Sequence, residues 1–353
     1  MINRDIVIIG PFDGPVTGQQ FITNYTATLV NKRLTLISTG GINISNIKFI
    51  ALWFKGFIKL TQICMLKKSR FIVYLSISRS WAGFVKESYI SFLQRIFKFT
   101  LVIHWHGAEP RLWVQGINPT LSRFFHMLWR GAALNIALTS SMAQDLKCLG
   151  FRNTSVVRNF PNINEKNFDQ VFIAPNNKTV RFLFLSNLLQ GKGLEDAIYS
   201  LNSIPNKNFT LDIVGSNYSS SSVRYKKLIE SCVFAKYHGC VEGFEKERLL
   251  KNCDVLVFPS TYRTEALPLA VIEAIFAGLV VVAYDHNYMS EFSEIQGVII
   301  TKPDPEKLSE VLNALCMNSM LLEKLKRANL RGRQIFSKTN YELSISKLLN
   351  DLC

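Results

Sequence analysis

The chain has 353 residues, of which 48% are hydrophobic, and its formal net charge is +15. This length exceeds the size at which one hydrophobic core stops growing, so two domains are expected. Seven scattered cysteines without a C-x-x-C pair argue against a disulfide scaffold or a zinc site, and no charged leader precedes Ile6–Ile9, which argues against secretion. A cytoplasmic protein is expected.

In the first half of the chain, apolar strand-like runs alternate with helical stretches. Strands are expected at Ile6–Ile9, Leu34–Ser38, Phe71–Ile77, Thr100–His104, Asn135–Thr139 and Ser155–Arg158. Helices are expected between them, for example at Gln19–Asn31, Tyr89–Lys98 and Leu121–Arg130. This alternation predicts a parallel sheet with helices on both faces.

Two short segments follow strands of this predicted sheet. Gly14, Thr17 and Gly18 form a loop after the first strand, where glycine permits close backbone approach to a ligand. The loop is not a G-x-G-x-x-G fingerprint, so a dinucleotide cofactor is not indicated. His104 and His106 lie at the carboxyl end of the strand at 100–104, the edge where open α/β sheets bind ligands. Either imidazole is a candidate for ligand contact, and the choice stays open here.

The positive charge is concentrated in the first half. Residues 1–160 contain 19 Lys and Arg against 5 Asp and Glu, whereas the remaining residues hold 22 against 21. Such asymmetry indicates an anionic partner, either nucleic acid or an anionic membrane surface. The segment Ile47–Lys68 is too often interrupted by lysine to span a bilayer. Its lysines share one helical stripe with Gln62, namely Lys48, Lys55 and Lys59.

Two interpretations of Ile47–Lys68 remain. The helix either lies in a membrane interface with its lysines directed to phosphates, or it is a mostly buried crossover between the strands at 34–38 and 71–77. The basic first half favours contact with a membrane surface.

The second half repeats the alternation. Strands are expected at Arg181–Leu185, Thr210–Val214, Val233–Tyr237, Val255–Phe258, Val280–Ala283 and Gly297–Ile300. Asn159–Asn162 and the polar run Asn164–Lys178 read as the linker. The pattern predicts two Rossmann-like doubly wound domains with a cleft between them, at residues 1–162 and 163–335, and a last helix within 336–353 that returns to the first domain.

Glu265 and Glu273 stand eight positions apart, around a turn that enters an apolar helix ending at Gly278. Buried strands flank this unit, which places the turn at the carboxyl edge of a parallel sheet. A helix N-terminus suits a diphosphate, and carboxylates accept bonds from vicinal hydroxyls. The layout suits a nucleotide-sugar site, whereas the spacing alone equally fits a solvated loop residue at Glu265 and an exposed helix face at Glu273. We expect Glu273→Ala to weaken nucleotide binding and to leave the fold intact.

Lys192, in Gln190-Gly-Lys-Gly193, follows the first strand of the second half and can neutralise a diphosphate as a point charge. Asn187, five residues earlier, can add a neutral hydrogen bond. No carboxylate and histidine cluster has metal-ligand spacing, so no metal is expected.

Four segments resemble retaining glycosyltransferases of the GT-B fold, family 4, of the bacterial polysaccharide and O-antigen type. The segment at 265–283 resembles their pattern E-G-L-P-x-x-x-x-E-A-M-A-x-G-x-P-V-V-A, with Ala266 and Val280 at the first glycine and last proline. The others are residues 6–20, 156–162 and 182–193, although the family usually carries an arginine where this chain has Asn187.

The resemblance implies a retaining glycosyltransferase that uses a nucleotide-diphosphate sugar without a metal or other cofactor. It implies that Glu265 and His106 act in catalysis and that eight residues bind the nucleotide sugar: Gly18, Asn187, Lys192, Ala266, Leu267, Pro268, Leu269 and Glu273. The apolar, basic first domain favours a lipid-linked glycan acceptor. The protein is therefore expected to be cytoplasmic and peripherally bound to the inner face of the plasma membrane. Two alternatives remain, a sugar-nucleotide epimerase on the same fold and a non-enzymatic basic module. Nucleic acid is disfavoured because no nucleic-acid motif accompanies the charge.

Overall fold

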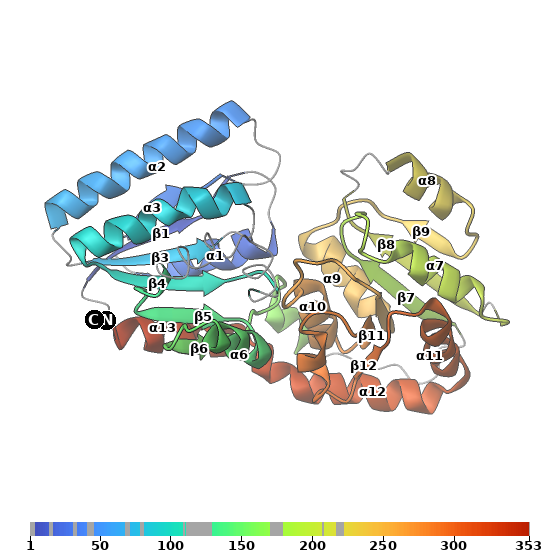
Figure 1. The fold of residues 1–353 in the computed structure, drawn as a ribbon. Coiled ribbons are helices and arrows are strands. Elements are labelled where there is room, and N and C mark those ends of the chain that lie inside the picture. The colour runs from blue at the N-terminus through green and yellow to red at the C-terminus, as the bar shows by residue number, and fades with distance from the viewer. Residues whose placement is uncertain are drawn as a thin grey trace. The chain divides into compact units, whose positions relative to one another are not determined.

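The computed structural model describes residues 4–13, 17–30, 34–40, 46–67, 71–77, 81–108, 110, 129–169, 179–206, 208–216 and 222–352. The chain forms two compact units, Met1–Asn159 with Lys338–Cys353 and, between these segments, Phe160–Ser337. Each unit contains a parallel six-stranded sheet with helices on both faces (Figure 1). The predicted class of two doubly wound α/β domains is confirmed.

The sheet of the first unit has the strand order β2-β1-β3-β4-β5-β6. Its elements are β1 (Asp5–Gly10), α1 (Gly18–Leu29), β2 (Leu34–Ser38), α2 (Asn46–Lys67), β3 (Phe71–Ile77), α3 (Trp81–Phe97), β4 (Thr100–Trp105), β5 (Leu134–Ala137), α6 (Ser140–Cys148), β6 (Thr154–Val156) and α13 (Lys338–Asn350). The central strands β1 and β3 are buried on both sides, as their continuous apolar sequences predict. The expected loop residue Gly14 and most of the expected helix Leu121–Arg130 lie outside the described residues.

The last helix, α13, packs against α1 of the first unit. The hydroxyl of Tyr341 lies 2.6 Å from Oγ1 of Thr26, and both side chains are buried. Glu342 of α13 also accepts a hydrogen bond from the hydroxyl of Tyr25. These contacts join the end of the chain to its beginning.

Helix α2 connects β2 to β3 but buries only a narrow stripe. Gly56, Leu60 and Cys64 are buried and four residues apart, and a Cβ on Gly56 would lie 2.8 Å from Cγ2 of Ile37. By contrast, Ile50 is 60% exposed and Phe54 is 58% exposed. The helix does connect the two strands, but the prediction that it is mostly buried is wrong. None of the described helices is long and apolar enough to cross a membrane.

The sheet of the second unit has the strand order β12-β11-β10-β7-β8-β9. Its elements are η1 (Glu165–Phe168), β7 (Val180–Leu185), α7 (Leu194–Asn202), β8 (Phe209–Val214), α8 (Ser222–Glu230), β9 (Ala235–Tyr237), α9 (Gly243–Asn252), β10 (Val255–Phe258), α10 (Leu269–Ala277), β11 (Val280–Tyr284), η2 (Met289–Phe292), β12 (Val298–Thr301), α11 (Pro305–Met317), α12 (Ser319–Gly332) and η3 (Arg333–Phe336). Every strand expected from the sequence is present within two residues of its predicted bounds.

Residues 160–169, within or beside the predicted linker, are part of the second unit, whereas Asn159 belongs to the first. Asn164 caps the short helix η1, its backbone N–H donates to Glu247 Oε1 at 2.8 Å, and Phe168 is fully buried. The prediction of a linker from Asn164 onwards is therefore wrong for residues 164–169, because one buried aromatic residue and a carboxylate acceptor anchor them. Residues 170–178 lie outside the described part of the chain.

Candidate functional site

Three loops meet at the carboxyl edge of the second sheet, and glycines allow their backbones to touch. Gly193 has φ of +82°, and a Cβ there would lie 2.1 Å from the carbonyl oxygen of Pro259. A Cβ on Gly215 would lie 1.8 Å from the carbonyl oxygen of Ser186. Any side chain at these positions would push the loops apart, so the two glycines fix the distance between the loops that follow β7, β8 and β10.

This packing brings Lys192 and Glu265 together, although they are 73 positions apart in the sequence. Lys192 Nζ lies 2.7 Å from Glu265 Oε1, and the two side chains are 12% and 16% exposed. The ammonium also stands 4.4 Å from the ring centroid of Tyr262. Two of the predicted ligand-binding residues therefore form a half-buried ion pair at the sheet edge, where a diphosphate would compete with Glu265 for the lysine.

Two residues that the sequence did not single out hold the loop of Glu265. Ser260 donates a hydrogen bond to Glu265 Oε2. Asn287 donates from Nδ2 to the backbone oxygens of Glu265 and Tyr262, at 2.8 and 3.2 Å. Asn287 adopts a left-handed conformation with φ of +52°, which asparagine tolerates better than most residues. Nothing in the local sequence signals this contact, because Asn287 follows a different strand, β11.

Helix α10 presents an uncapped N-terminus beside this loop. Its N-cap residue is Pro268, which makes no side-chain capping bond, so the first-turn N–H groups have no partner within the helix. Ala266 and Leu267 are each 4% exposed, and Pro268 is also buried. Only main-chain groups of these three residues are suited to contact a ligand. The first-turn N–H groups of α10 and the helix dipole favour an anion at this point.

Glu273 is buried in the second turn of α10 and is already paired. Its Oε1 accepts a hydrogen bond from Lys246 Nζ at 2.8 Å and another from the backbone N–H of Asn162 at 3.2 Å. Burial raises the pKa of the Glu273 carboxyl, and the neighbouring Lys246 ammonium opposes that rise. Because the Glu273 and Lys246 side chains are 5% and 11% exposed, this pair is also a structural element of the second unit.

The first unit carries the other predicted site residues at the carboxyl edge of its own sheet. Gly18 is the exposed first residue of α1, and Thr17 caps that helix by accepting a hydrogen bond from Gln20 N at 3.2 Å. Gln19 Nε2 donates to Ser76 Oγ at 2.9 Å and to the backbone oxygen of Ile77 at 3.2 Å. The N-terminus of α1 is thereby fixed to the end of β3.

The two histidines differ in their surroundings. His104 is fully buried within β4, and its Nδ1 is hydrogen-bonded to the hydroxyl of Tyr74. His106 follows the strand and is partly exposed, and its buried Nε2 has no hydrogen-bond partner among the described residues. Burial lowers the pKa of His106 to about 3, so the ring is neutral near pH 7. The geometry favours His106 for donating a hydrogen bond to a ligand and disfavours it as a cation that shares leaving-group charge.

Among the predicted residues, the structure thus joins Lys192, Glu265 and the start of α10, with Asn187 exposed on the loop after β7. Glu273 points instead to Lys246 of α9, a partner that no sequence motif singles out. Gly18 and His106 belong to the first unit. An ammonium, a carboxylate and the first-turn N–H groups of a helix at one sheet edge are suited to a phosphorylated, hydroxyl-rich ligand.

Two doubly wound domains, with this site at the sheet edge of the second, define the GT-B class of fold. Residues 165–334 match the family Glycosyl transferases group 1, and this range lies within the second unit. The match indicates a glycosyltransferase domain. No curated protein sequence matches the chain.

Solved structures extend the similarity over the whole chain. A glycosyltransferase from Rickettsia africae ESF-5 has a TM-score of 0.76 and 16% identity, covering 99% of each chain. Alr3699/HepE from Anabaena, in complex with UDP-glucose, has a TM-score of 0.73 and 16% identity, covering 99% of this chain and 100% of that one. The lipopolysaccharide outer core galactosyltransferase WaaB has a TM-score of 0.68 and 15% identity, with coverage of 99% and 100%. At such identities, the likeness establishes the fold.

Proposed function

We propose that the protein is a retaining glycosyltransferase that moves a sugar from a nucleotide-diphosphate sugar to a membrane-associated glycan acceptor carried on a polyprenyl diphosphate. The observation that carries the proposal is the Lys192–Glu265 pair beside the uncapped N-terminus of α10. In this proposal, Lys192 and the N–H groups bind the diphosphate, and no metal is needed. Glu265 accepts hydrogen bonds from the donor sugar, and Glu273 Oε2 accepts one from the ribose.

Catalysis in this proposal rests on position and on electrostatic stabilisation. The leaving diphosphate gains negative charge as the glycosidic bond breaks, and Lys192 with the helix N-terminus stabilises that charge. Glu265 faces the positive charge that develops on the sugar ring. Neutral His106 donates a hydrogen bond to a sugar hydroxyl.

The assignment can be tested by product analysis. The protein is incubated with UDP-glucose and other nucleotide sugars, together with a polyprenyl-diphosphate-linked glycan, and the anomeric configuration of the product is read from proton coupling. We expect an α-linked donor to give an α-linked product. A β-linked product from the same donor would contradict retention, and an absence of transfer from every donor, with no thermal stabilisation by any of them, would contradict the proposed activity.

The membrane-bound acceptor is supported by an apolar helical face on the first unit. Helices α2 and α3 lie side by side, with the ring centroids of Phe57 and Tyr89 5.2 Å apart (Figure 1). Large apolar side chains on both helices are exposed; this face comprises Ile50, Phe54, Ile58, Met65 and Leu66 of α2 with Phe92 and Ile96 of α3. Lys48, Lys55 and Arg95 on the same helices are exposed as well, while Lys59 donates to the backbone oxygen of Leu36.

Because exposed apolar rows flanked by cations fit an anionic lipid surface, we place the protein on the inner face of the plasma membrane as a peripheral protein. The protein is expected to co-sediment with vesicles that contain anionic lipid and to be released by salt. Each basic residue near the surface contributes about 1 kcal/mol to the free energy of binding. The substitutions Ile50→Gln, Phe54→Gln and Ile58→Gln, made together, should weaken vesicle binding at least about tenfold, since each buried side chain contributes about 1.5–3 kcal/mol.

A matched control variant replaces the same number of exposed apolar side chains on the second unit. Val223, Phe244 and Met320 of the second unit are 63%, 81% and 81% exposed, and their replacement by Gln should leave vesicle binding unchanged. Equal loss in both triple variants, or equal partitioning of the wild type onto neutral vesicles, would show that the apolar helical face is not the docking surface.

A further inference from the structure

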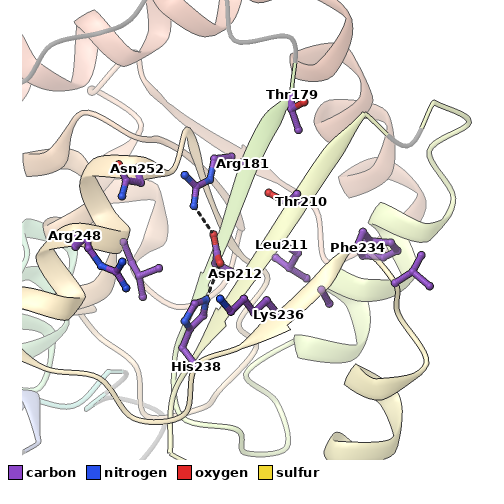
Figure 2. Close-up of a pocket in the computed structure, with 13 residues that line it drawn as sticks. Thr179, Arg181, Thr210, Leu211, Asp212, Phe234, Lys236, His238, Arg248 and Asn252 are labelled. Carbon is purple, nitrogen blue, oxygen red and sulfur yellow. Dashed lines mark hydrogen bonds and ion pairs between the residues drawn. The ribbon is translucent and has the colours of Figure 1, made fainter.

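A cavity of about 650 Å³ opens on one face of the second sheet, away from the candidate donor site. It is formed by β7, β8, β9 and α9 (Figure 2). Arg181 and Thr210 line it from the second positions of β7 and β8, whereas the candidate donor residues follow the ends of β7 and β10. None of the residues proposed above for the donor site lines this cavity. Its volume lies within the range typical of small-molecule sites.

The floor of the cavity is a buried carboxylate whose two oxygens are already bonded. Asp212 Oδ1 lies 2.7 Å from His238 Nε2, and Oδ2 lies 3.3 Å from Arg181 Nη2. The side chains of Asp212 and His238 are 9% and 10% exposed. Figure 2 shows Asp212 between Arg181 and His238, with both partners directed to its carboxylate. The carboxylate therefore orients two basic side chains, and its own charge is largely met by them.

The cavity carries an excess of positive charge. The described residues that line it include three Lys and Arg side chains, Arg181, Lys236 and Arg248, against one carboxylate, Asp212. Lys236 is opposite Asp212 in the parallel pairing of β8 and β9, which places it on the same sheet face. Arg181 has five N–H donors and donates one hydrogen bond to Asp212. Arg248 also forms an exposed, long ion pair with Glu245 of its own helix, at 3.9 Å. A ligand anion would therefore meet Lys236, the remaining guanidinium donors of Arg181, and Arg248 in competition with Glu245.

We propose that this cationic pocket is a second ligand site, which binds a phosphate-bearing small molecule of the size of a sugar phosphate or a mononucleotide. Guanidinium and ammonium groups that converge from separate elements are suited to phosphate oxygens. The cavity is larger than a bare phosphate requires, and Phe234 and Leu249 supply apolar surface for the rest of the ligand. Unlike an isolated surface lysine pair, the pocket has a preorganised floor, because Asp212 fixes Arg181 and His238 before any ligand binds. The inference is independent of the proposed transferase activity.

The test removes the charges of two exposed cations, Lys236 and Arg248, and leaves Asp212 and its two partners unchanged. Titration calorimetry is carried out with inorganic phosphate, glucose 1-phosphate and uridine monophosphate on the wild type and on the double variant Lys236→Gln with Arg248→Gln. We expect the variant to bind the preferred probe at least about tenfold more weakly, because each charge-assisted hydrogen bond lost contributes at least that factor. Inorganic phosphate tests the shared chemistry, and the other two probes rank the ligand classes.

The matched control is Lys324→Gln with Arg331→Gln, two exposed cations of α12 outside the cavity. The donor site is intact in all three proteins, so any phosphate bound beside Lys192 contributes equally and cancels in the comparison. The control should bind like the wild type. If the pocket variant and the control variant bind all three probes with the same affinity and stoichiometry as the wild type, the pocket is not a phosphate site and the inference is overturned.

Discussion

Glu265→Gln is expected to lower the turnover number about 10²–10³-fold and not to lower the nucleoside diphosphate affinity. The amide keeps the size of the side chain but removes the negative charge that faces the developing cation on the donor sugar. Lys192 then loses its ion-pair partner, 2.7 Å away, and becomes fully available to the diphosphate. Steady-state kinetics give kcat, and calorimetry with UDP gives the affinity.

The control for this substitution is Glu294→Gln, an exposed carboxylate of the second unit, which should leave both quantities unchanged. The contrary result has two forms. A wild-type kcat in Glu265→Gln would remove Glu265 from the catalytic site. A loss of nucleotide affinity equal to the loss of kcat/KM, with kcat unchanged, would assign Glu265 to uniform substrate binding instead.

The secondary structure was predictable because its signals are local. Runs such as Phe71–Ile77 and Val255–Phe258 are rich in β-branched and aromatic residues and are bounded by polar segments, and both strands have their predicted bounds. A parallel strand is buried on both faces, so its whole sequence is apolar and no alternation needs to be recognised. Glycines at the loops, Gly193 and Gly278, mark the helix starts and ends in the same local way.

The partners within the candidate site were not predictable in this way. Lys192 and Glu265 can be selected from separate motifs, but their direct ion pair depends on how closely the loops approach. Ser260 and Asn287 hold the Glu265 loop through bonds to a carboxylate and to backbone oxygens, and the sequence pattern of a strand end is the same with or without such bonds. These contacts are properties of the tertiary structure.

Helix α2 shows the corresponding limit for burial. Its sequence is apolar around most of its circumference, which fits both a buried helix and an interfacial one. Only packing decides between them, and the close approach at Gly56 leaves Phe54 and Ile58 exposed. The lysine stripe was visible in the sequence, whereas packing alone determines which apolar side chains beside it are exposed.

The burial of Glu273 changes the expected effect of replacing it. The sequence placed this carboxylate on a helix that faces a ligand, so its loss was expected to leave the fold intact. In the structure, however, Glu273 Oε1 is the acceptor for Lys246 and for the Asn162 backbone, and the Lys246 side chain is 11% exposed. Removal of one partner of a buried ion pair leaves an uncompensated charge.

Glu273→Ala is therefore expected to destabilise the second unit by about 3–5 kcal/mol, in addition to weakening nucleotide binding by about 1–3 kcal/mol. All five tryptophans belong to the first unit, so tryptophan fluorescence follows that unit while circular dichroism follows both. Denaturant titration should show a fall in stability by circular dichroism and a smaller change by fluorescence. The double variant Glu273→Leu with Lys246→Met should recover most of the stability but not the nucleotide affinity, which separates the structural role from the ligand role. Wild-type stability in Glu273→Ala would show that the Lys246 pair contributes nothing to the fold.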